Sequence, residues 1–483
     1  MIDLKNLTIK KAHDSMIKRD FTSRELTQAY LDAIKEKNKD LNAILEVFED
    51  TLIFADKADK KIKNGTAGLL TGIPFILKDN ILVEGKIASA GSKILENYIA
   101  TYDATVVKIL KEEGAVILGR SNMDEFAMGS STQTSAYGIA RNPYDITRVP
   151  GGSSGGSAVS VASDMSLCAL GTETCGSVRQ PASFCGLVGL KPTYGAMSRS
   201  GLIAMGNSLD QPASFTKNVE DAEIIFNALS KYDKMDMTSV PMEKRNIPTS
   251  DIGGLPMSDV GNGEIKKIGV PRSFFSGGGV DKEVLKNFDE KIEALKKVGY
   301  EIVDLDMPDL DYSLAVYYII MPAEVSTNLS RFDGIRYGYS AEGKDLMDVY
   351  MKSRGQGFGK EARRRILLGT YVLSHGYYDA YYNKAVLLRE KISREIAKAF
   401  EKVDLIATPT TPTPAFKLGE KMNDPVAMYL CDIFSAPANI AGIPSIALPS
   451  GKNKDGLPLS FQFMAPHFCE DKLFTIGKIF ETL

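Results

Sequence analysis

Two serines in glycine-rich stretches and one lysine at the end of an apolar run are the residues of this chain best suited to chemistry. Ser153 lies in GGSSGGS and Ser177 in TCGSVRQP, both within the segment from Pro150 to Pro192. Glycine-rich loops let the backbone approach a ligand closely and turn several N–H groups toward it. Because the residues around both loops are small and apolar, we interpret the loops as part of a buried site rather than as two solvated surface turns.

A serine hydroxyl becomes a useful nucleophile only when a neighbouring base takes its proton. The spacing Gly151-x-Ser153-x-Gly155 matches the nucleophile elbow of α/β-hydrolases, in which a histidine is the base. That elbow follows a strand, whereas the segment RNPYDITRVP before Ser153 has no strand pattern. The chain has three histidines, none beside another plausible catalytic group: His13, His375 and His467. The sequence therefore disfavours a histidine-based hydrolase.

Lys78 is the alternative base. It ends the apolar stretch GLLTGIPFILK, and burial there would disfavour the charged ammonium and leave a neutral amine. The competing interpretation is a strand-end lysine whose amine reaches solvent, and on the lysine alone that interpretation is favoured.

Lys78 in KDN, Ser153 in PGGSSGGS and Ser177 in GSVRQPA together resemble the amidase signature family, over nearly the whole chain. The resemblance implies that Ser177 attacks an amide carbonyl, that Ser153, held in a cis-peptide conformation, relays its proton, and that Lys78 is the base. Preorganised backbone donors must then stabilise the tetrahedral oxygen. The expected oxyanion hole consists of the N–H groups of Thr174, Cys175, Gly176 and Ser177.

The loop around the second serine departs from the family pattern. It reads GTETCGS where GTDTGGS is usual, so Glu173 and Cys175 are substitutions. If position 175 requires a positive φ, a cysteine there costs about 1 kcal/mol or more. Arg179 is expected to orient the loop through a carboxylate such as Glu173, and Lys191 to be a scaffold residue. The substitutions leave open a catalytically weakened paralogue that acts as an assembly partner, while Cys175 as the nucleophile is disfavoured because Ser177 already fills that place.

Within the family, the chain is most similar to the A subunits of bacterial glutamyl-tRNA(Gln) amidotransferases, in stretches such as EFAMGSSTQTSAYG and YYIIMPAEVSTNLSRFDGIRYG. This similarity implies a glutaminase that supplies ammonia for converting Glu-tRNA(Gln) to Gln-tRNA(Gln). It also implies a heterotrimer with B and C subunits, in which the B subunit binds the mischarged tRNA and uses ATP and Mg²⁺. Gln133, Ala213 and the pair Ser460-Phe461 depart from the usual pattern, which leaves a divergent copy open. A stand-alone amidase of small amides is the alternative function.

A glutaminase must recognise a free amino acid. A planar guanidinium suits the α-carboxylate, and a carboxylate suits the α-ammonium. The resemblance assigns these roles to Arg365 and Asp432, with Tyr317 lining the pocket. The arginine is fixed only to within positions 363–365, and the tyrosine only to within 317–318.

The alternation of helical and apolar strand patterns predicts an α/β fold, and the resemblance implies a large central mixed β-sheet flanked by helices. Thr22 and Glu25 form a capping-box pattern at the start of an early helix. We expect the late strands VDLIATPT, PSIALP and LSFQFMAP to rejoin the first sheet, making 1–483 a single domain with a catalytic core at 60–230. Residues 231–265 are interpreted as a surface connection, and 314–400 as a helical insertion that contributes to the substrate pocket.

Composition narrows the functional class further. The net charge of −3 provides no positive field for nucleic acid or an anionic membrane, which fits a chain that leaves tRNA to its partner. No G-x-x-x-x-G-K-[ST] pattern occurs, so we expect no nucleotide cofactor on this chain. Five cysteines without a C-x-x-C pair predict neither disulfides nor a metal site. With no signal peptide and no run of about 18 apolar residues, a cytoplasmic protein is expected.

Overall fold

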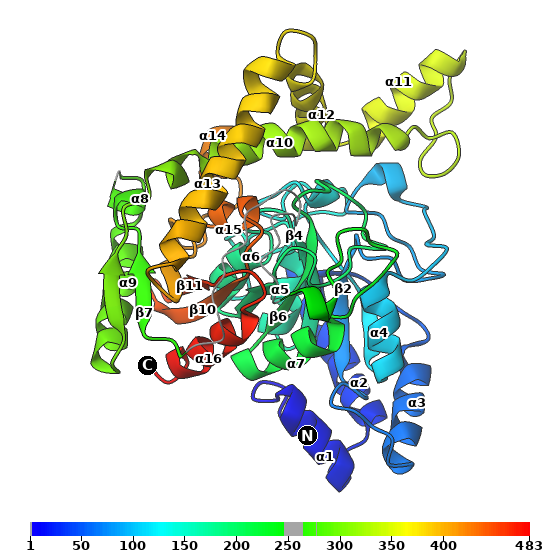
Figure 1. The fold of residues 1–483 in the computed structure, drawn as a ribbon. Coiled ribbons are helices and arrows are strands. Elements are labelled where there is room, and N and C mark those ends of the chain that lie inside the picture. Colours follow the sequence, from blue (N-terminus) through cyan, green and yellow to red (C-terminus); the bar gives the residue numbers. More distant parts are fainter. Residues whose placement is uncertain (1, 246–263, 277) are drawn as a thin grey trace.

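One large β-sheet runs through the middle of the molecule in the computed structural model, which describes residues 2–245, 264–276 and 278–483 (Figure 1). Among these residues it has eleven strands in the order β1-β3-β2-β4-β6-β5-β10-β11-β9-β7-β8. β2 is parallel to β3 and β4, whereas β4 and β6 are antiparallel. The strands are β1 (Ile44–Val47), β2 (Pro74–Lys78), β3 (Val116–Ser121), β4 (Cys168–Glu173), β5 (Val188–Lys191), β6 (Gln211–Thr216), β7 (Lys267–Val270), β8 (Glu301–Asp304), β9 (Leu405–Pro409), β10 (Ser445–Lys452) and β11 (Pro458–Met464). The predicted α/β fold with a large mixed sheet is confirmed.

The central strands are buried along their whole length. Every residue of β2, β3, β4 and β6 is buried, which requires cover on both faces of the sheet. The helices that provide the cover and the surrounding layers are α1 (Ile9–Lys18), α2 (Ser23–Leu41), α3 (Thr51–Lys63), α4 (Thr105–Glu113), α5 (Gly155–Ala162), α6 (Arg179–Cys185), α7 (Val219–Leu229), α8 (Ser273–Ser276), α9 (Lys282–Lys297), α15 (Ala436–Ile440) and α16 (Glu470–Phe480). The capping box of α2 is formed as predicted, with Glu25 and Thr22 each accepting from the other's backbone N–H.

The late strands rejoin the first sheet, as expected. β10 pairs with β5 and with β11, and β11 pairs with β9. Three strands were not predicted: β5, which is only four residues long, β6 and β7. β6 contains Pro212 and no run of β-branched residues, and β7 is only four residues long, so neither has a clear strand signal.

A layer of helices lies across one end of the sheet, at the top of Figure 1. It consists of α10 (Ser313–Asn328), α11 (Leu346–Gly357), α12 (Lys360–Val372) and α13 (Lys384–Phe400), with a π-helix at Tyr378–Asn383. α10 packs against α12, α13 and α15. The short α14 (Pro425–Tyr429) belongs to the loop that follows β9.

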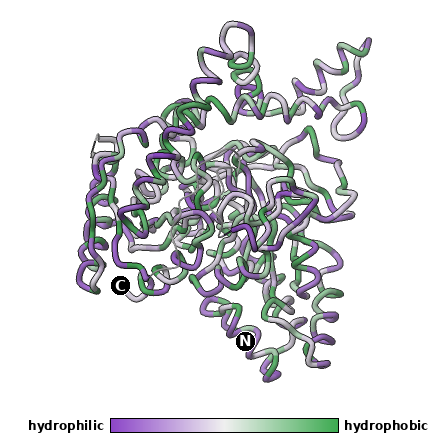
Figure 2. Tube along the Cα trace, viewed as in Figure 1, coloured by the Kyte–Doolittle hydropathy of each residue, from purple (hydrophilic) through white to green (hydrophobic). Residues whose placement is uncertain are grey.

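The distribution of hydrophilic and hydrophobic residues matches the burial of the sheet under its helices. Hydrophilic positions recur along α9 at the edge of the molecule, while hydrophobic positions concentrate toward the centre (Figure 2). No helix in the described ranges is long and apolar enough to cross a membrane. Most of the predicted surface connection at 231–265 lies outside the described residues, since 246–263 are not among them.

The contact between α10 and α12 yields a stability prediction. Gly369 of α12 lies against the backbone carbonyl of Pro322 in α10, so a new Cβ would overlap that oxygen. We expect Gly369→Ala to lower the free energy of unfolding by about 1–3 kcal/mol, measured by denaturant titration. Gly355→Ala in α11 is the control, because no atom lies within 4 Å of a Cβ there, and a gain of about 0.4–1 kcal/mol is expected. Equal stability of the two variants would contradict the close helix contact.

Candidate active site

Lys78 lies at the end of β2 in the middle of the sheet, and its side chain is fully buried. Its amine is 2.8 Å from Ser153 Oγ, and it also contacts Thr172 Oγ1 at 3.0 Å and the Thr172 carbonyl at 3.2 Å. Burial lowers the pKa of Lys78 to about 7, against the opposing effect of three buried carboxylates. A lysine with this pKa is partly neutral near pH 7, so it can accept a proton from Ser153.

The loop that carries Ser153 is held from several sides. The peptide bond between Gly152 and Ser153 is cis, as the family resemblance implies. Gly152 N donates to Gln180 Oε1 at 2.8 Å, and Gln180 Nε2 donates to the Ser130 carbonyl at 3.0 Å. The carbonyl of Ser153 accepts from Asp124 N at 3.1 Å. These bonds fix the Ser153 hydroxyl relative to Lys78.

Ser177 ends the turn that follows β4. It is only 5% exposed, and Ser154 N donates to its carbonyl at 3.2 Å, which joins the two serine loops. Within the described part of the chain, the Ser177 hydroxyl and the N–H groups of Cys175, Gly176 and Ser177 have no hydrogen-bond partner. Free N–H groups beside a free hydroxyl are what a nucleophile and its oxyanion hole require.

Cys175 does not strain this turn. Its φ is not positive, and the left-handed conformation is taken instead by Gly176, with φ 78°. A Cβ at Gly176 would also overlap Ser435 Oγ, so glycine is required at 176 and cysteine is tolerated at 175. Burial raises the pKa of the Cys175 thiol well above its ordinary value, and a neutral buried thiol is a poor nucleophile.

A buried ion pair braces the same turn. Arg179 Nη2 lies 2.6 Å from Glu173 Oε1, and both side chains are fully buried. The other Glu173 oxygen accepts from Val178 N and Arg179 N at 3.0 Å each. Although burial raises it, the pKa of Glu173 is kept below its ordinary value by Arg179. Arg179 thus contacts Glu173 as expected, and the longer glutamate is accommodated.

Asp432 lies beside the nucleophile turn. A Cβ at Gly176 would be 3.1 Å from its Oδ1. Ser130 Oγ lies within 2.9 and 2.7 Å of the two carboxylate oxygens, and the Tyr318 hydroxyl donates to Oδ2 at 3.2 Å. Burial raises the pKa of Asp432 to about 7. A cationic ligand group would offset that burial, so the position suits an ammonium.

Arg365 of α12 supplies the opposite charge. Its Nε donates to Glu361 Oε1 at 2.8 Å, and Nη2 donates to the Gly129 carbonyl at 3.0 Å. The guanidinium lies 5.3 and 5.1 Å from the ring centroids of Tyr318 and Tyr429. Among the described residues, its Nη1 contacts a methionine sulfur at 3.7 Å and no oxygen acceptor, so it can still donate to a ligand carboxylate.

The structure distinguishes between the neighbouring residues that the sequence left open. Arg365 is buried, whereas Arg363 is exposed and Arg364 forms a peripheral ion pair with Glu361. Tyr317 and Tyr318 pack edge to face with centroids 4.8 Å apart. Tyr317 is buried beside the site, but it is Tyr318 that contacts Asp432.

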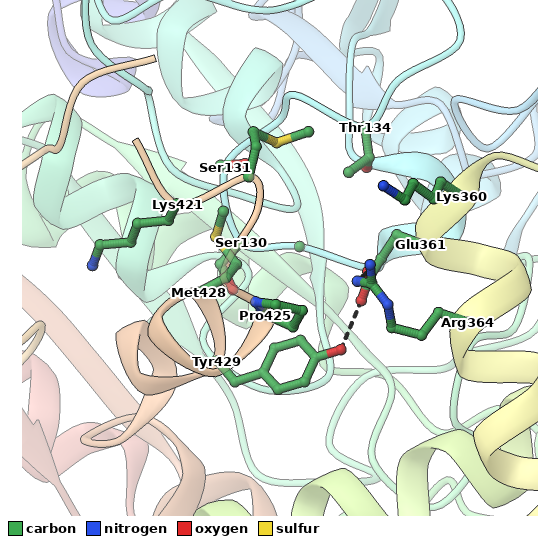
Figure 3. Close-up of a pocket in the computed structure, with 12 residues that line it drawn as sticks. Ser130, Ser131, Thr134, Lys360, Glu361, Arg364, Lys421, Pro425, Met428 and Tyr429 are labelled. Carbon is green, nitrogen blue, oxygen red and sulfur yellow. Dashed lines mark hydrogen bonds and ion pairs between the residues drawn. The ribbon is translucent and has the colours of Figure 1, made fainter. Parts of the chain in front are cut away.

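A pocket of about 140 Å³ opens beside this cluster (Figure 3). Its lining includes Ser130, Glu361 and Tyr429, which also contact Asp432 or Arg365. The Tyr429 hydroxyl donates to Glu361 at 2.9 Å, the dashed line in Figure 3. The pocket is therefore separated from Asp432 and Arg365 by side chains that contact them, and neither charged residue lines it.

Sequence reasoning did not identify several of these contact residues. Ser130, Thr172 and Tyr429 are far from their partners in the chain, so no local pattern marks them. The i,i+4 spacing of Glu361 and Arg365 on one helix was the one available signal.

The histidine-based alternative finds no support in the described residues. No strand leads directly into Ser153 as a nucleophile elbow requires. His467 is buried, with Nε2 2.9 Å from the Ala441 carbonyl. Lys191 is also buried, and its amine donates to the Pro192 carbonyl rather than to a serine, as expected of a scaffold residue.

The environment of Lys78 predicts the pH dependence of catalysis. Since the base must be neutral, we expect kcat/KM to fall about tenfold per pH unit below pH 7, and Lys78→Met to lower it about 10²–10⁴-fold. Lys191→Met is the matched control, because burial also lowers the pKa of Lys191 to about 7. In Lys191→Met, kcat/KM should still fall below the same pH as in the unmodified chain. A shift of that pH in Lys191→Met would contradict Lys78 as the base.

Comparisons with known proteins agree with this geometry. A family model described as Amidase matches residues 25–474. The A subunit of the glutamyl-tRNA(Gln) amidotransferase of Thermoanaerobacter pseudethanolicus is 50% identical over 485 residues, which cover 99% of this chain and 97% of that protein.

Two solved structures share the fold. The crystal structure of the A subunit of glutamyl-tRNA(Gln) amidotransferase from Thermotoga maritima matches with a TM-score of 0.78 and 39% identity, over 98% of this chain and 94% of that one. The native peptide amidase from Stenotrophomonas maltophilia matches with a TM-score of 0.79 and 28% identity, over 99% and 97%. The family model and the amidotransferase relatives span nearly the whole chain, and the chain belongs to the amidase family.

Proposed function

We propose that this protein is the glutamine-hydrolysing A subunit of a glutamyl-tRNA(Gln) amidotransferase. The observation that carries the proposal is the position of Asp432 beside the turn of Ser177, with Arg365 close to Asp432 across the ring of Tyr318. A carboxylate and a guanidinium on one side of a nucleophile suit the two charged α-groups of an amino acid whose side-chain amide is to be cleaved. The names of the most similar relatives support the same function.

The proposed reaction starts from the contact of Lys78 with Ser153 and takes the serine roles from the family. Neutral Lys78 takes the proton of Ser153, which takes that of Ser177, and Ser177 Oγ attacks the side-chain carboxamide carbon of glutamine. The N–H groups of the turn, from Thr174 to Ser177, stabilise the oxyanion. The proton returns through Ser153 to the leaving nitrogen, and ammonia departs. Water then hydrolyses the γ-glutamyl ester on Ser177 and releases glutamate.

The proposal includes partners. The released ammonia would serve B and C subunits in a heterotrimer, where the B subunit binds Glu-tRNA(Gln) and uses ATP and Mg²⁺. The net charge of −3 is compatible with a chain that does not itself hold tRNA. A cytoplasmic location and the absence of a resident cofactor on this chain remain predictions.

The first test is detection of the covalent intermediate. The purified chain is mixed with glutamine, alone and with the B and C subunits, and its intact mass is measured. We expect a γ-glutamyl adduct that is absent from Ser177→Ala, because the Ser177 hydroxyl lies beside N–H groups that are free within the described residues. An adduct that persists in Ser177→Ala would place the nucleophile elsewhere. Rapid turnover of simple amides without turnover of glutamine would indicate a stand-alone amidase.

The second test concerns substrate recognition. Arg365→Met should raise the KM for glutamine about 10–100-fold, because a charge-assisted contact to the α-carboxylate is lost. The KM for a small uncharged amide should change less than about twofold, since such an amide lacks that group. Arg363→Met, the exposed neighbour on the same helix that does not line the pocket, is the control and should leave both values unchanged. Equal KM changes for both substrates would show a general structural defect.

A further inference from the structure

Asp210 is a buried carboxylate directly behind the oxyanion turn, and the reaction described above does not use it. It is 6% exposed and stands immediately before β6. The antiparallel register of β4 and β6 pairs Glu173 with Gln211, so the next opposed positions beyond the end of the ladder are 174 and 210. The two strands therefore place Asp210 against Thr174.

The side chain of Asp210 forms three hydrogen bonds there. Its Oδ1 accepts from Thr174 Oγ1 at 2.6 Å, and its Oδ2 accepts from Met205 N at 2.8 Å and from Gly206 N at 3.0 Å. One carboxylate thus joins the first residue of the oxyanion turn to the turn at 205–210. Because Asp210 is buried, loss of either partner would leave polar groups unsatisfied.

The turn at 205–210 is in turn fixed by the helical layer. Asn328 of α10 donates to the Met205 carbonyl at 3.0 Å, and Glu324 of α10 accepts from Ser208 N at 3.0 Å. Arg389 of α13 donates to Ser208 Oγ at 3.1 Å and to the Ser208 carbonyl at 3.0 Å. The oxyanion turn is therefore connected, through Asp210, to the two helices that cross the end of the sheet.

We propose that Asp210 is a positioning residue that aligns the oxyanion turn through Thr174. It does not touch the substrate. It fixes the start of the turn whose unbonded Cys175, Gly176 and Ser177 N–H groups form the proposed oxyanion hole, and it ties that start to α10 and α13. The proposal rests on amide hydrolysis at Ser177 but not on glutamine as the amide.

The expected consequence is a loss of kcat without a loss of binding. Asp210→Asn keeps the shape of the side chain but cannot accept all three hydrogen bonds, since its NH₂ group only donates. Misplacing oxyanion donors lowers kcat, so we expect a decrease of about tenfold or more with KM for glutamine within about twofold. Thr174→Val, which removes only the hydroxyl, should have a similar effect. Thr174→Ser, which keeps it, should retain most of the activity.

Two comparisons separate positioning from a general loss of structure. The kcat of the double variant Asp210→Asn/Thr174→Val should be no lower than that of the slower single variant. Both substitutions disrupt the same hydrogen bond, so their effects do not add. Asp221→Asn is the matched control: Asp221 is equally buried and accepts from Ile9 N at 3.0 Å, but it links α1 to α7 away from the site. It should lower thermal stability and leave kcat unchanged.

A second readout makes the test independent of the substrate. The rate at which a fluorophosphonate labels Ser177, followed by intact mass, also depends on the oxyanion turn. We expect that rate to fall in Asp210→Asn and Thr174→Val and to remain in Asp221→Asn. If the unmodified chain is labelled but does not hydrolyse glutamine, the proposed function fails while the role of Asp210 is still decided. Labelling rates in folded Asp210→Asn and Thr174→Val that match the unmodified chain would overturn the proposal.

Discussion

The contact between Lys78 and Ser153 depends on keeping a lysine amine entirely out of water. An unpaired ammonium in the middle of a sheet would be prohibitively costly, and the group responds by losing its proton at about pH 7. Ser153 and Thr172 then satisfy the amine from two sides. The buried position that makes the lysine a base is thus a property of the central strand β2, between β3 and β4, rather than of the loops alone.

The nucleophile turn depends on distant parts of the chain. Arg179 pairs with Glu173 next to the turn, and its Nη2 and Nη1 also donate to Asn439 of α15 and Gln462 of β11 at 2.5 and 2.9 Å. Removing one partner of a buried charged network leaves an uncompensated charge, which typically costs about 3–5 kcal/mol. Residues 60–230 contain the triad, yet they do not contain all the groups that hold its turn. The late strands are therefore part of the catalytic architecture.

Local patterns in the sequence predicted most of the sheet, whereas the roles of Lys78, Ser153 and Ser177 came from the family resemblance. Apolar strands, the capping box of Thr22 and Glu25 and glycine-rich loops are local signals, and they specify local structure. β6 lacked such a signal, since Pro212 and small residues do not suggest a strand until β4 and β5 lie on either side. The contacts of Asp432 with Ser130 and Tyr318 join residues separated by 302 and 114 positions. Only the assembled fold brings them together, so motif reading alone did not find them.

Catalysis and recognition come from different layers of this molecule. Lys78, Ser153 and Ser177 belong to the sheet and to the loops braced on it, whereas Arg365 comes from α12 and Asp432 from the segment after β9. The layers meet at Gly176, where a side chain would reach both Ser435 and Asp432. Substitutions in the helical layer can therefore change which amide is bound while the buried lysine and both serines stay in place. A fold shared by a peptide amidase and by the A subunit of an amidotransferase is the outcome such a division permits.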